Sequence, residues 1–399
     1  MAENNNIPMV RFAAFAHEWE KQKFDDILDK YEDPVATPHD GYERLGVRSH
    51  VKGTFHSYVA PGAELETAQM HRVAADKMLF NITFAWEHAV AITAENDAGK
   101  LVSHRFPQFS FAPEMYPKFF KYVVADEKFR YHLWLSSPGG AGRNRVLNIP
   151  EMLQYETHLP KKQEQICIAE WFGNLDNLIA QHQSRLEKLQ SIKSSMLEKM
   201  FPKDGADVPQ VRFKKFSGIW ERHKVGDFLI ESRIAGHTGL TAKKLTVKLW
   251  GKGVVEKSDA YGGSVHTQYY VRKTGQFMYG KLDFLHAAFG IVPQNLDGYE
   301  STLDSPAFDL SGIDGQFLLN TVIQENFYLK NGMIANGSRK AKRIHADTFL
   351  DMDILVPSIK EQKKIGDYFV QMDKQISFAQ LEVDKLQNLK KALLEKMFV

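Results

Sequence analysis

Cysteine is almost absent from this sequence, and its scarcity excludes an internal disulfide framework. The 399 residues include one cysteine, Cys167. A single thiol cannot form a bridge within the chain, and disulfides belong mainly to oxidising compartments. The sequence therefore predicts a protein of the reducing cytoplasm, in which Cys167 is a small core residue.

Long apolar runs and a strong charge of one sign are also lacking. No uncharged stretch approaches the roughly 20 residues of a membrane-spanning helix, and no basic segment followed by an apolar one marks a secretory signal at the N-terminus. We therefore expect neither a membrane span nor secretion. Because the formal net charge is only +2, a nucleic-acid partner would require locally grouped cations.

Sequence signatures of catalysis are missing as well. The 15 histidines are scattered, with no HExxH pair and no metal-ligand spacing, and neither a GxSxG elbow nor a PD…(D/E)xK nuclease pattern occurs. The segment Gly275–Lys281 has the spacing of a phosphate-binding loop, but Leu282 stands where that loop places the Ser or Thr that binds magnesium. We therefore expect no catalytic residues, no metal and no cofactor.

The sequence does contain a duplication. Residues 185–201 read RLEKLQSIKSSMLEKMF and residues 382–398 read EVDKLQNLKKALLEKMF, at a displacement of 197. Upstream, Glu164-Gln165 recurs as Glu361-Gln362 at the same displacement, and residues 8–12 match residues 209–213 at a displacement of 201. The drift between these values indicates small insertions and deletions. The whole chain is explained as a tandem repeat of one unit of about 200 residues.

Apolar residues in the duplicated segments recur at steps of three and four, as on one face of a helix. A helix from Leu175 to Phe201 would be roughly 40 Å long at 1.5 Å per residue, which favours a helix pair over a helix buried in one small domain. We therefore expect an intramolecular coiled coil; the alternative is that each stripe packs on its own domain. The seam residues are Leu175, Ile179, Leu186, Leu189, Met196, Met372, Ile376, Val383, Leu386 and Leu393, and the stripes also include Ile192 and Leu389.

The remainder of each copy alternates short strand-like segments with glycine and proline breaks. Spaced aromatic residues at 113–135 and 317–328 indicate helix packed on sheet, and we expect a short helix at 21–31. The predicted fold class is α+β, with two globular α+β domains, two long helices and an internal pseudo-two-fold repeat. The expected domains are 1–158 and 204–355, each followed by a helical spacer, at 159–203 and 356–399 respectively.

Two glycine-containing polar stretches carry grouped cations at matching positions of the copies. Glycine lets the main chain approach a phosphate, and a guanidinium group can pair with a phosphate or with the acceptor edge of guanine. The duplication of the cluster favours DNA contact over an ordinary solvated loop, which is the alternative. The candidate DNA-binding residues are Arg143, Asn144 and Arg145 in the first copy, Ser338, Arg339, Lys340, Lys342 and Arg343 in the second, and the flanking pair Arg48 and Lys52.

These motifs together resemble the specificity (S) subunit of type I restriction-modification systems, and the resemblance spans essentially the whole chain. The residues that carry it are Pro160, Glu164-Gln165, Ile168, Phe172, Leu175-Asp176, Lys188-Leu189, Leu197 and Met200-Phe201, repeated from Pro357 to Phe398. These segments look like the two conserved regions of the family, and the units between them look like its target recognition domains. The first copy departs from the second at Gly173, where Val370 stands, which predicts a bend or break in the first helix.

The resemblance implies a non-catalytic, sequence-specific DNA-binding subunit. One recognition domain would read each half of a bipartite, asymmetric site in double-stranded DNA, and an antiparallel pair of long helices would separate the two domains. Methyltransferase (M) subunits, expected to number two, would dock around these helices, and restriction (R) motor-nuclease subunits would join them in the cytoplasm. A coiled-coil adaptor without nucleic-acid binding and a nucleotide-dependent enzyme built on Gly275–Lys281 remain as alternatives.

Overall fold

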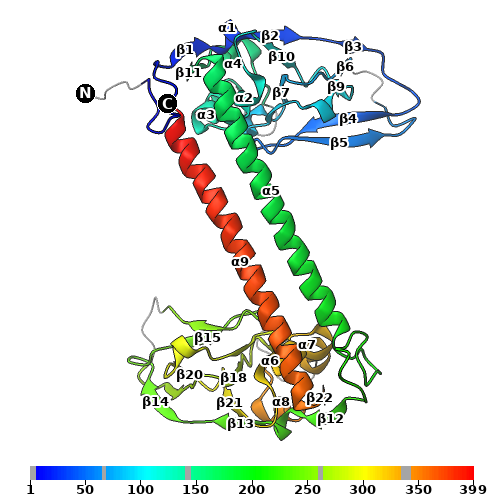
Figure 1. Ribbon diagram of the computed structural model, residues 1–399, viewed down its shortest axis with the longest axis vertical. Coiled ribbons are helices and arrows are strands. Elements are labelled where there is room, and N and C mark those ends of the chain that lie inside the picture. Colours follow the sequence, from blue (N-terminus) through cyan, green and yellow to red (C-terminus); the bar gives the residue numbers. More distant parts are fainter. Residues whose placement is uncertain (1–5, 65–68, 140–144, 259–263, 334–342) are drawn as a thin grey trace. The chain divides into compact units, whose positions relative to one another are not determined.

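The computed structural model describes residues 6–64, 69–139, 145–258, 264–333 and 343–399. The chain divides into two compact units (Figure 1). Unit 1 comprises residues 1–181 and 383–399, and unit 2 comprises residues 182–382. Each unit therefore contains one α+β head together with part of each long helix.

The head of unit 1 is built on a four-stranded sheet in the order β2, β10, β7, β8. A second sheet has five strands in the order β3, β6, β9, β4, β5. Strands β1 and β11 form a separate two-stranded sheet. The strands are β1 (Glu20–Lys23), β2 (Leu28–Tyr31), β3 (Pro34–Val35), β4 (Tyr42–Val47), β5 (Thr54–Val59), β6 (Met70–Arg72), β7 (Met78–Phe80), β8 (Val90–Ile92), β9 (Leu101–Ser103), β10 (Gln108–Phe111) and β11 (Glu156–Leu159). The helices are α1 (Phe24–Ile27), η1 (Ala85–Glu87), η2 (Glu95–Asp97), α2 (Pro117–Val123), α3 (Glu127–Leu135) and α4 (Ile149–Leu153).

The head of unit 2 repeats this plan. Its four-stranded sheet runs β13, β21, β18, β19, its outer strands form the sheets β14-β17-β20 and β15-β16, and β12 pairs with β22. The strands are β12 (Glu221–Lys224), β13 (Leu229–Ser232), β14 (Ala235–Thr238), β15 (Leu245–Val247), β16 (Val254–Glu256), β17 (Gln268–Val271), β18 (Phe277–Tyr279), β19 (Phe289–Ile291), β20 (Glu300–Ser301), β21 (Ala307–Leu310) and β22 (Asp353–Val356). The helices are η3 (Val225–Asp227), η4 (Phe284–His286), η5 (Gln294–Leu296), α6 (Gly315–Val322), α7 (Glu325–Gly332) and α8 (Ala346–Leu350).

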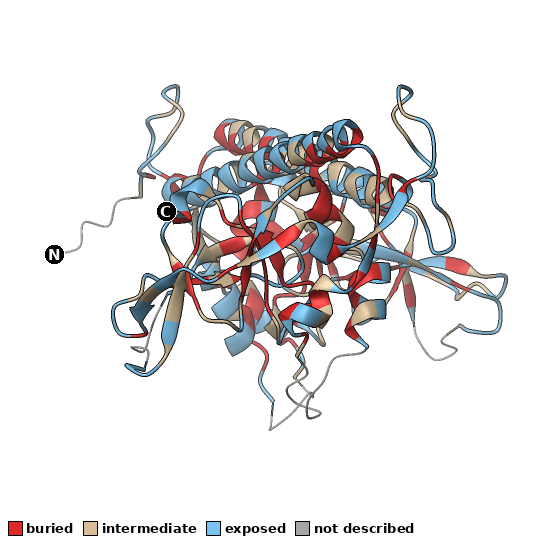
Figure 2. Ribbon diagram, turned by 90° about the horizontal axis from the view of Figure 1, so that it is seen from below, coloured by how far each residue is buried: buried red, intermediate tan, exposed pale blue. Residues whose placement is uncertain are grey.

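Aromatic side chains fill the space between each four-stranded sheet and its helices. In unit 1, Phe24 lies 5.2 Å from Phe129 and 5.1 Å from Tyr155, measured between ring centroids. In unit 2, the rings of Tyr279 and Phe349 are 4.6 Å apart. Burying one such ring contributes about 1.5–3 kcal/mol, so these clusters hold the heads together. Figure 2 shows the buried residues in the interior of the sheet-and-helix layers, whereas the outlying hairpins are largely exposed.

The two long helices are α5 (Lys162–Lys199, 38 residues) and α9 (Ile359–Met397, 39 residues). In unit 1, the beginning of α5 shares a core with the end of α9, through Phe172 and Met397. In unit 2, the end of α5 shares a core with the beginning of α9, through Met200 and Phe369. Within each unit the two helices thus run antiparallel, and the expected fold class is confirmed.

The expected break at Gly173 is wrong, because α5 continues through this residue as one helix. Glycine inside a helix costs about 1 kcal/mol relative to alanine. The neighbouring Phe172 and Leu175 are both buried, and their packing offsets that cost.

The expected helix at residues 21–31 is also wrong. This segment forms β1, the single turn α1 and β2. The end strands pair with β11 and β10 respectively, so hydrogen bonds to distant segments override the local helical tendency. The aromatic segments at 113–135 and 317–328 do contain helices: α2 and α3 in the first, and α6 and α7 in the second.

Candidate nucleic-acid interface

Arg145 is the best-defined cation of the first predicted cluster. It follows α3, and its guanidinium carbon lies 4.9 Å from the ring centroid of Trp134 and 5.9 Å from that of Trp86. Trp134 in turn stacks on Tyr131 at 6.0 Å between centroids, and both rings are exposed. Contact with an aromatic face restrains a guanidinium group without using its N–H donors. Arg145 is therefore oriented and able to donate to an external acceptor.

Arg343 is the corresponding described cation of unit 2. Its Nε lies 3.6 Å from Asp304 Oδ1, and both side chains are exposed. The next residue is anchored, because the Ile344 backbone N–H donates to the Lys281 carbonyl and Tyr279 Oη donates to the Ile344 carbonyl at 2.9 Å. The remaining predicted residues of the two clusters, Arg143, Asn144, Ser338, Arg339, Lys340 and Lys342, lie outside the described residues.

The flanking pair Arg48 and Lys52 lies on the turn between β4 and β5. Arg48 closes this turn through its contact with the Thr54 carbonyl, and its guanidinium carbon lies 5.3 Å from the Phe55 ring centroid. The turn docks on η1, because the Val51 backbone N–H donates to the His88 carbonyl at 3.1 Å. Since η1 also carries Trp86, the turn and the Arg145 cluster share one supporting element.

The Gly275–Lys281 segment does not form a phosphate-binding loop. Residues Phe277–Tyr279 are strand β18, fully buried in the middle of the four-stranded sheet. A phosphate loop requires exposed backbone N–H groups before a helix, and the N–H groups of this segment face neighbouring strands. This geometry gives no support to the nucleotide-enzyme alternative.

The predicted seam residues all lie at buried or half-buried positions of the long helices. Leu175, Leu186, Met372 and Val383 are buried, and Ile179, Leu189, Met196, Ile376, Leu386 and Leu393 are half-buried. Ile192 and Leu389, however, are 46% and 45% exposed. A straight helix drifts by about 20° per seven residues from a 3.5-residue repeat, which carries some stripe positions away from the partner helix.

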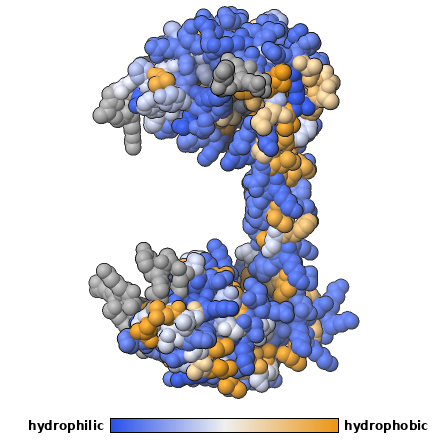
Figure 3. Space-filling model, turned by 90° about the vertical axis from the view of Figure 1, so that its left-hand side faces the viewer, coloured by the Kyte–Doolittle hydropathy of each residue, from blue (hydrophilic) through white to orange (hydrophobic). Residues whose placement is uncertain are grey.

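Exposed apolar side chains interrupt the otherwise hydrophilic surface of the helices (Figure 3). The exposed apolar residues of α5 and α9 include Leu178, Ile192, Phe378, Leu381 and Leu389, each at least 40% exposed. Contiguous exposed apolar patches mark contacts with other proteins, whereas apolar residues scattered singly are normal on a protein surface.

Sequence inspection missed the role of the repeated Glu-Gln pair. Glu164 is buried, and its two oxygens accept hydrogen bonds from Arg11 at 2.7 and 2.6 Å. Gln165 accepts from the Tyr116 N–H at 2.8 Å and donates to the Pro160 carbonyl at 2.8 Å. Unit 2 repeats this clamp with Glu361 on Arg212 and with Gln362 on the Asp314 N–H. The pair therefore fastens the N-terminal segment and a head helix to each long helix.

Asp176 on α5 is a second junction in unit 1. Its carboxylate contacts Lys121 of α2 at 2.7 Å and Lys390 of α9 at 2.5 Å, and Tyr122 Oη donates to it at 3.2 Å. Burial tends to raise the pKa of Asp176, but the hydrogen bonds from the two lysines outweigh this effect and lower it. One carboxylate thus connects three helices.

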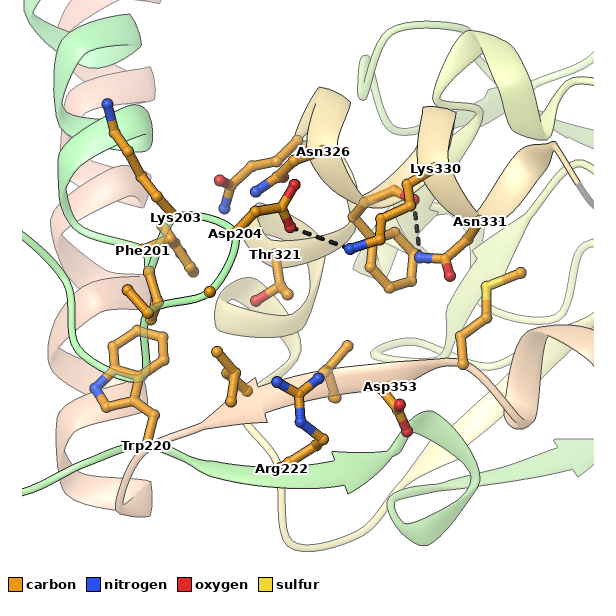
Figure 4. A pocket seen from close by; sticks show the side chains of 18 of the residues that line it. Phe201, Lys203, Asp204, Trp220, Arg222, Thr321, Asn326, Lys330, Asn331 and Asp353 are labelled. Carbon is orange, nitrogen blue, oxygen red and sulfur yellow. Dashed lines mark hydrogen bonds and ion pairs between the residues drawn. The ribbon is translucent and has the colours of Figure 1, made fainter.

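A cavity of about 360 Å³ lies where the end of α5 meets the head of unit 2 (Figure 4). Arg222 of β12 points into it, and an ion pair of 3.2 Å between Asp204 and Lys330 closes one side. Unit 1 has a hollow of the same volume at the corresponding place, lined by Val123, Thr157 and Phe398 among others. The two units therefore share this cavity as well, and in each unit it is lined by residues of the head and by residues at or just beyond a long-helix end.

The described residues contain neither a candidate metal site nor a membrane-spanning helix. Among the described residues, no group of three or more His, Cys, Asp or Glu lies close enough together to bind a metal ion. Nor does the described part of the chain include a helix that is both long enough and apolar enough to cross a membrane.

No family model matches the sequence, but the fold has close counterparts among solved structures. The type I restriction-modification system S subunit from M. genitalium aligns with a TM-score of 0.60 over 98% of this chain and 99% of that one, at 13% identity. A chain from a study of complex assembly and conformational transition in the type I restriction-modification system aligns with a TM-score of 0.50, at 13% identity, over 95% and 97% of the two chains. The HsdS subunit from Thermoanaerobacter tengcongensis aligns with a TM-score of 0.46, at 14% identity, over 95% and 96%. The chain therefore has the fold of the S subunits of type I restriction-modification systems.

Proposed function

We propose that this chain is the DNA-recognition subunit of a type I restriction-modification complex and that each unit reads one half of a bipartite target. The observation that carries this proposal is the end-to-end likeness to the M. genitalium S subunit, which includes both heads and both long helices. Two heads with one fold and different side chains suit two unlike half-sites. A coiled-coil adaptor without a DNA partner would not require two heads that share a fold but differ in their side chains.

The contacts to DNA come from the cationic segments after α3 and α7. Lysine and arginine contacts to phosphates set the register of the protein, whereas contacts to base edges select sequence. The aromatic faces around Arg145 orient its guanidinium group for bidentate donation, most favourably to guanine O6 and N7. Its described counterpart in unit 2 is Arg343, an exposed side chain that, among the described residues, only the 3.6 Å contact with Asp304 restrains.

Partner subunits supply the reaction. The exposed apolar residues of α5 and α9 form the surface on which M subunits dock, with R subunits joining the same complex. This chain contributes no catalytic residue and acts in the cytoplasm, where its double-stranded DNA target is found. Its role in the complex is to recognise the DNA target.

The test is selection of DNA by the complex of this chain with its M subunit. A library of split targets with randomised half-sites and spacers should yield one enriched bipartite site. Arg145→Ala should reduce selectivity in one half-site and Arg343→Ala in the other, while Lys188→Ala, an exposed cation on α5, should change neither. Absence of any enriched bipartite site would favour the adaptor alternative.

A further inference from the structure

The outer sheet of unit 2 holds an exposed histidine against a buried carboxylate. The His237 side chain on β14 is 67% exposed, whereas that of Glu300 on β20 is 3% exposed. Glu300 Oε1 lies 2.5 Å from His237 Nδ1, and Glu300 Oε2 accepts the His237 backbone N–H at 2.7 Å. One buried carboxylate thus fixes both the main chain and the ring of a surface histidine.

Gly236 makes room for this arrangement. A Cβ atom on Gly236 would lie 2.3 Å from Glu300 Oε2 and 2.6 Å from its Cδ. The pairing of β14 with β17 also shifts register between Ala235 and Thr238, so His237 lies in an irregular stretch of strand. Such irregularities re-aim side chains and are frequent beside functional sites. The glycine and the shifted register together place the imidazole within hydrogen-bonding distance of the carboxylate.

Strand β20 is held in turn by a buried arginine. Arg272 is fully buried; its Nε donates to Ser301 Oγ at 2.7 Å and its Nη1 donates to the Ser232 carbonyl at 2.9 Å. Burial lowers the pKa of Arg272 to about 10, so the group stays charged at neutral pH. The residue next to Glu300 is therefore fixed by a charged donor, which limits the movement of the carboxylate.

Unit 1 builds the equivalent strands without these polar groups. The pairing of Tyr270 with Ser301 in unit 2 matches that of His71 with Val102 in unit 1. By this register, Glu300, Ser301 and Arg272 stand where unit 1 has Leu101, Val102 and Val73, all of them buried. Replacing buried charged groups by apolar ones is often neutral or stabilising. Because unit 1 already uses the apolar version, the polar version in unit 2 calls for a role other than stability.

A short stretch of chain connects Glu300 with the residue that contacts Arg343. Strand β20 leads to Asp304, which contacts Arg343 and whose carbonyl accepts the Lys281 N–H at 2.8 Å. Four residues of chain from Glu300 to Asp304 span at most about 14 Å at 3.4 Å per residue. A major groove is about 12 Å wide. One stretch of DNA can therefore contact both His237 and Arg343.

We propose that His237, oriented by Glu300, reads a base in the half-site that unit 2 recognises, an inference that rests on the proposed function. In the neutral imidazole tautomer that donates from Nδ1–H to the Glu300 carboxylate, Nε2 keeps its lone pair and accepts. Among the described residues, Nε2 has no hydrogen-bond partner. The donors on the major-groove edges of the bases are the amino groups of adenine and cytosine. His237 therefore selects adenine or cytosine over guanine or thymine at one position of one strand.

The test uses the complex of the full chain with its M subunit and the library of split targets. Three variants remove the reading group in different ways: His237→Ala deletes the ring, Glu300→Leu introduces the residue type of unit 1, and Gly236→Ala displaces the carboxylate while keeping both partners. Each should lower discrimination roughly 10-fold at a single base position of one half-site, within the range of one good base contact. His266→Ala, which removes another exposed histidine of unit 2, should leave every preference unchanged.

The possible outcomes separate this inference from the proposed function. If the unaltered chain enriches no bipartite site, both fail. If it does enrich a site and His237→Ala keeps full discrimination, His237 does not read a base, although the proposed function stands. A uniform loss of affinity on all sequences, with a shallower salt dependence, would identify a phosphate contact and would also overturn the inference. Because His237→Ala removes an exposed side chain only, misfolding does not explain a change confined to one base position.

Discussion

Asp176 shows how a single carboxylate can make the stability of unit 1 depend on pH. Its folded-state pKa is lowered, since the hydrogen bonds from Lys121 and Lys390 outweigh burial, which acts to raise it. Such a group contributes stability above its unfolded pKa, about 3.9, and that contribution is lost as the pH falls through the folded pKa. We expect Asp176→Asn to lower Tm at pH 7 and to differ less from the unaltered protein as the pH approaches 3.

Thermal unfolding followed between pH 7 and pH 3 checks this expectation. Asp25→Asn, at an exposed position on α1, is the matched control and should leave the curve unchanged. A Tm difference for Asp176→Asn that stays constant across this range would show that the two lysine contacts contribute no pH-dependent stability.

The buried Glu361 should be sensitive to substitution, because it is one side of a buried ion pair. Glu361→Ala leaves the Arg212 guanidinium, whose side chain is 16% exposed, without its partner. Breaking one side of a buried pair costs about 3–5 kcal/mol, whereas replacing both sides with apolar groups can be nearly neutral. We expect a loss of about 3 kcal/mol in urea denaturation, and recovery of part of it in the double variant Arg212→Met with Glu361→Leu. A loss as small as that of the exposed control Glu395→Ala would contradict this account.

Residue roles of this kind were only partly accessible from the sequence. The repeat drew attention to Glu164-Gln165, but the partner of Glu164 is Arg11, 153 positions away, and no local pattern links the two. His237 carried no signal at all, because its partner Glu300 is 63 positions away and the other unit has an apolar residue there. Arg145 was identified from grouped cations, whereas the two tryptophan faces that orient it emerge only from the fold.

At the scale of elements, periodicity predicted the long helices and their pairing but underestimated their length. α5 begins at Lys162, well before Leu175 where the stripe was first recognised. Its first turns bury Ile168 and Phe172 in the head of unit 1, so their apolar pattern serves a globular core in addition to a seam. The segment at 21–31 was misread for a related reason, since its form is decided by pairing with distant strands.

The helix pair should be sensitive to a charge at its seam. Leu189→Asp places a carboxylate at a half-buried position of α5, and burying an unpaired polar group costs about 1–3 kcal/mol in proteins. We expect a lower Tm and weaker assembly with the M subunit, measured by light scattering at several concentrations. The neighbouring Gln190→Asp lies at an exposed position and should assemble normally. Equal assembly by the two variants would argue against a seam at Leu189.

At the scale of the whole molecule, the structural units and the sequence repeats do not coincide. The core of unit 1 includes Met397 from the end of the second repeat, and the core of unit 2 includes Met200 and Phe201 from the end of the first. Each head is therefore completed by residues of the opposite repeat. The sequence revealed the duplication, but an exchange of ends depends on which core each helix end enters, and the repeat alone does not determine that.

Phe398 provides a test of this exchange. Its ring lies 5.6 Å from that of Phe119 and 5.9 Å from that of Trp19, measured between centroids. We expect Phe398→Ala to destabilise unit 1 by about 2–3 kcal/mol, less than the roughly 3–5 kcal/mol typical of a buried Phe→Ala change, because the ring is only half-buried. Hydrogen exchange measured by mass spectrometry should then rise in residues 6–139 and stay unchanged in the head of unit 2. The reciprocal variant Phe201→Ala should give the opposite pattern, and a uniform response to both variants would refute the exchange.

The exchanged helix ends also dictate an order of events during synthesis. Residues 182–382 are all synthesised before residues 383–399, so every residue of unit 2 has been made before the last turns of α9. Unit 1, although its head is translated first, lacks the turns of α9 that cap its core until residues 383–399 have been made and have left the exit tunnel. The nascent chain thus passes through a stage in which all residues of unit 2 have been made but the core of unit 1 still lacks these turns, with its apolar surface accessible to chaperones.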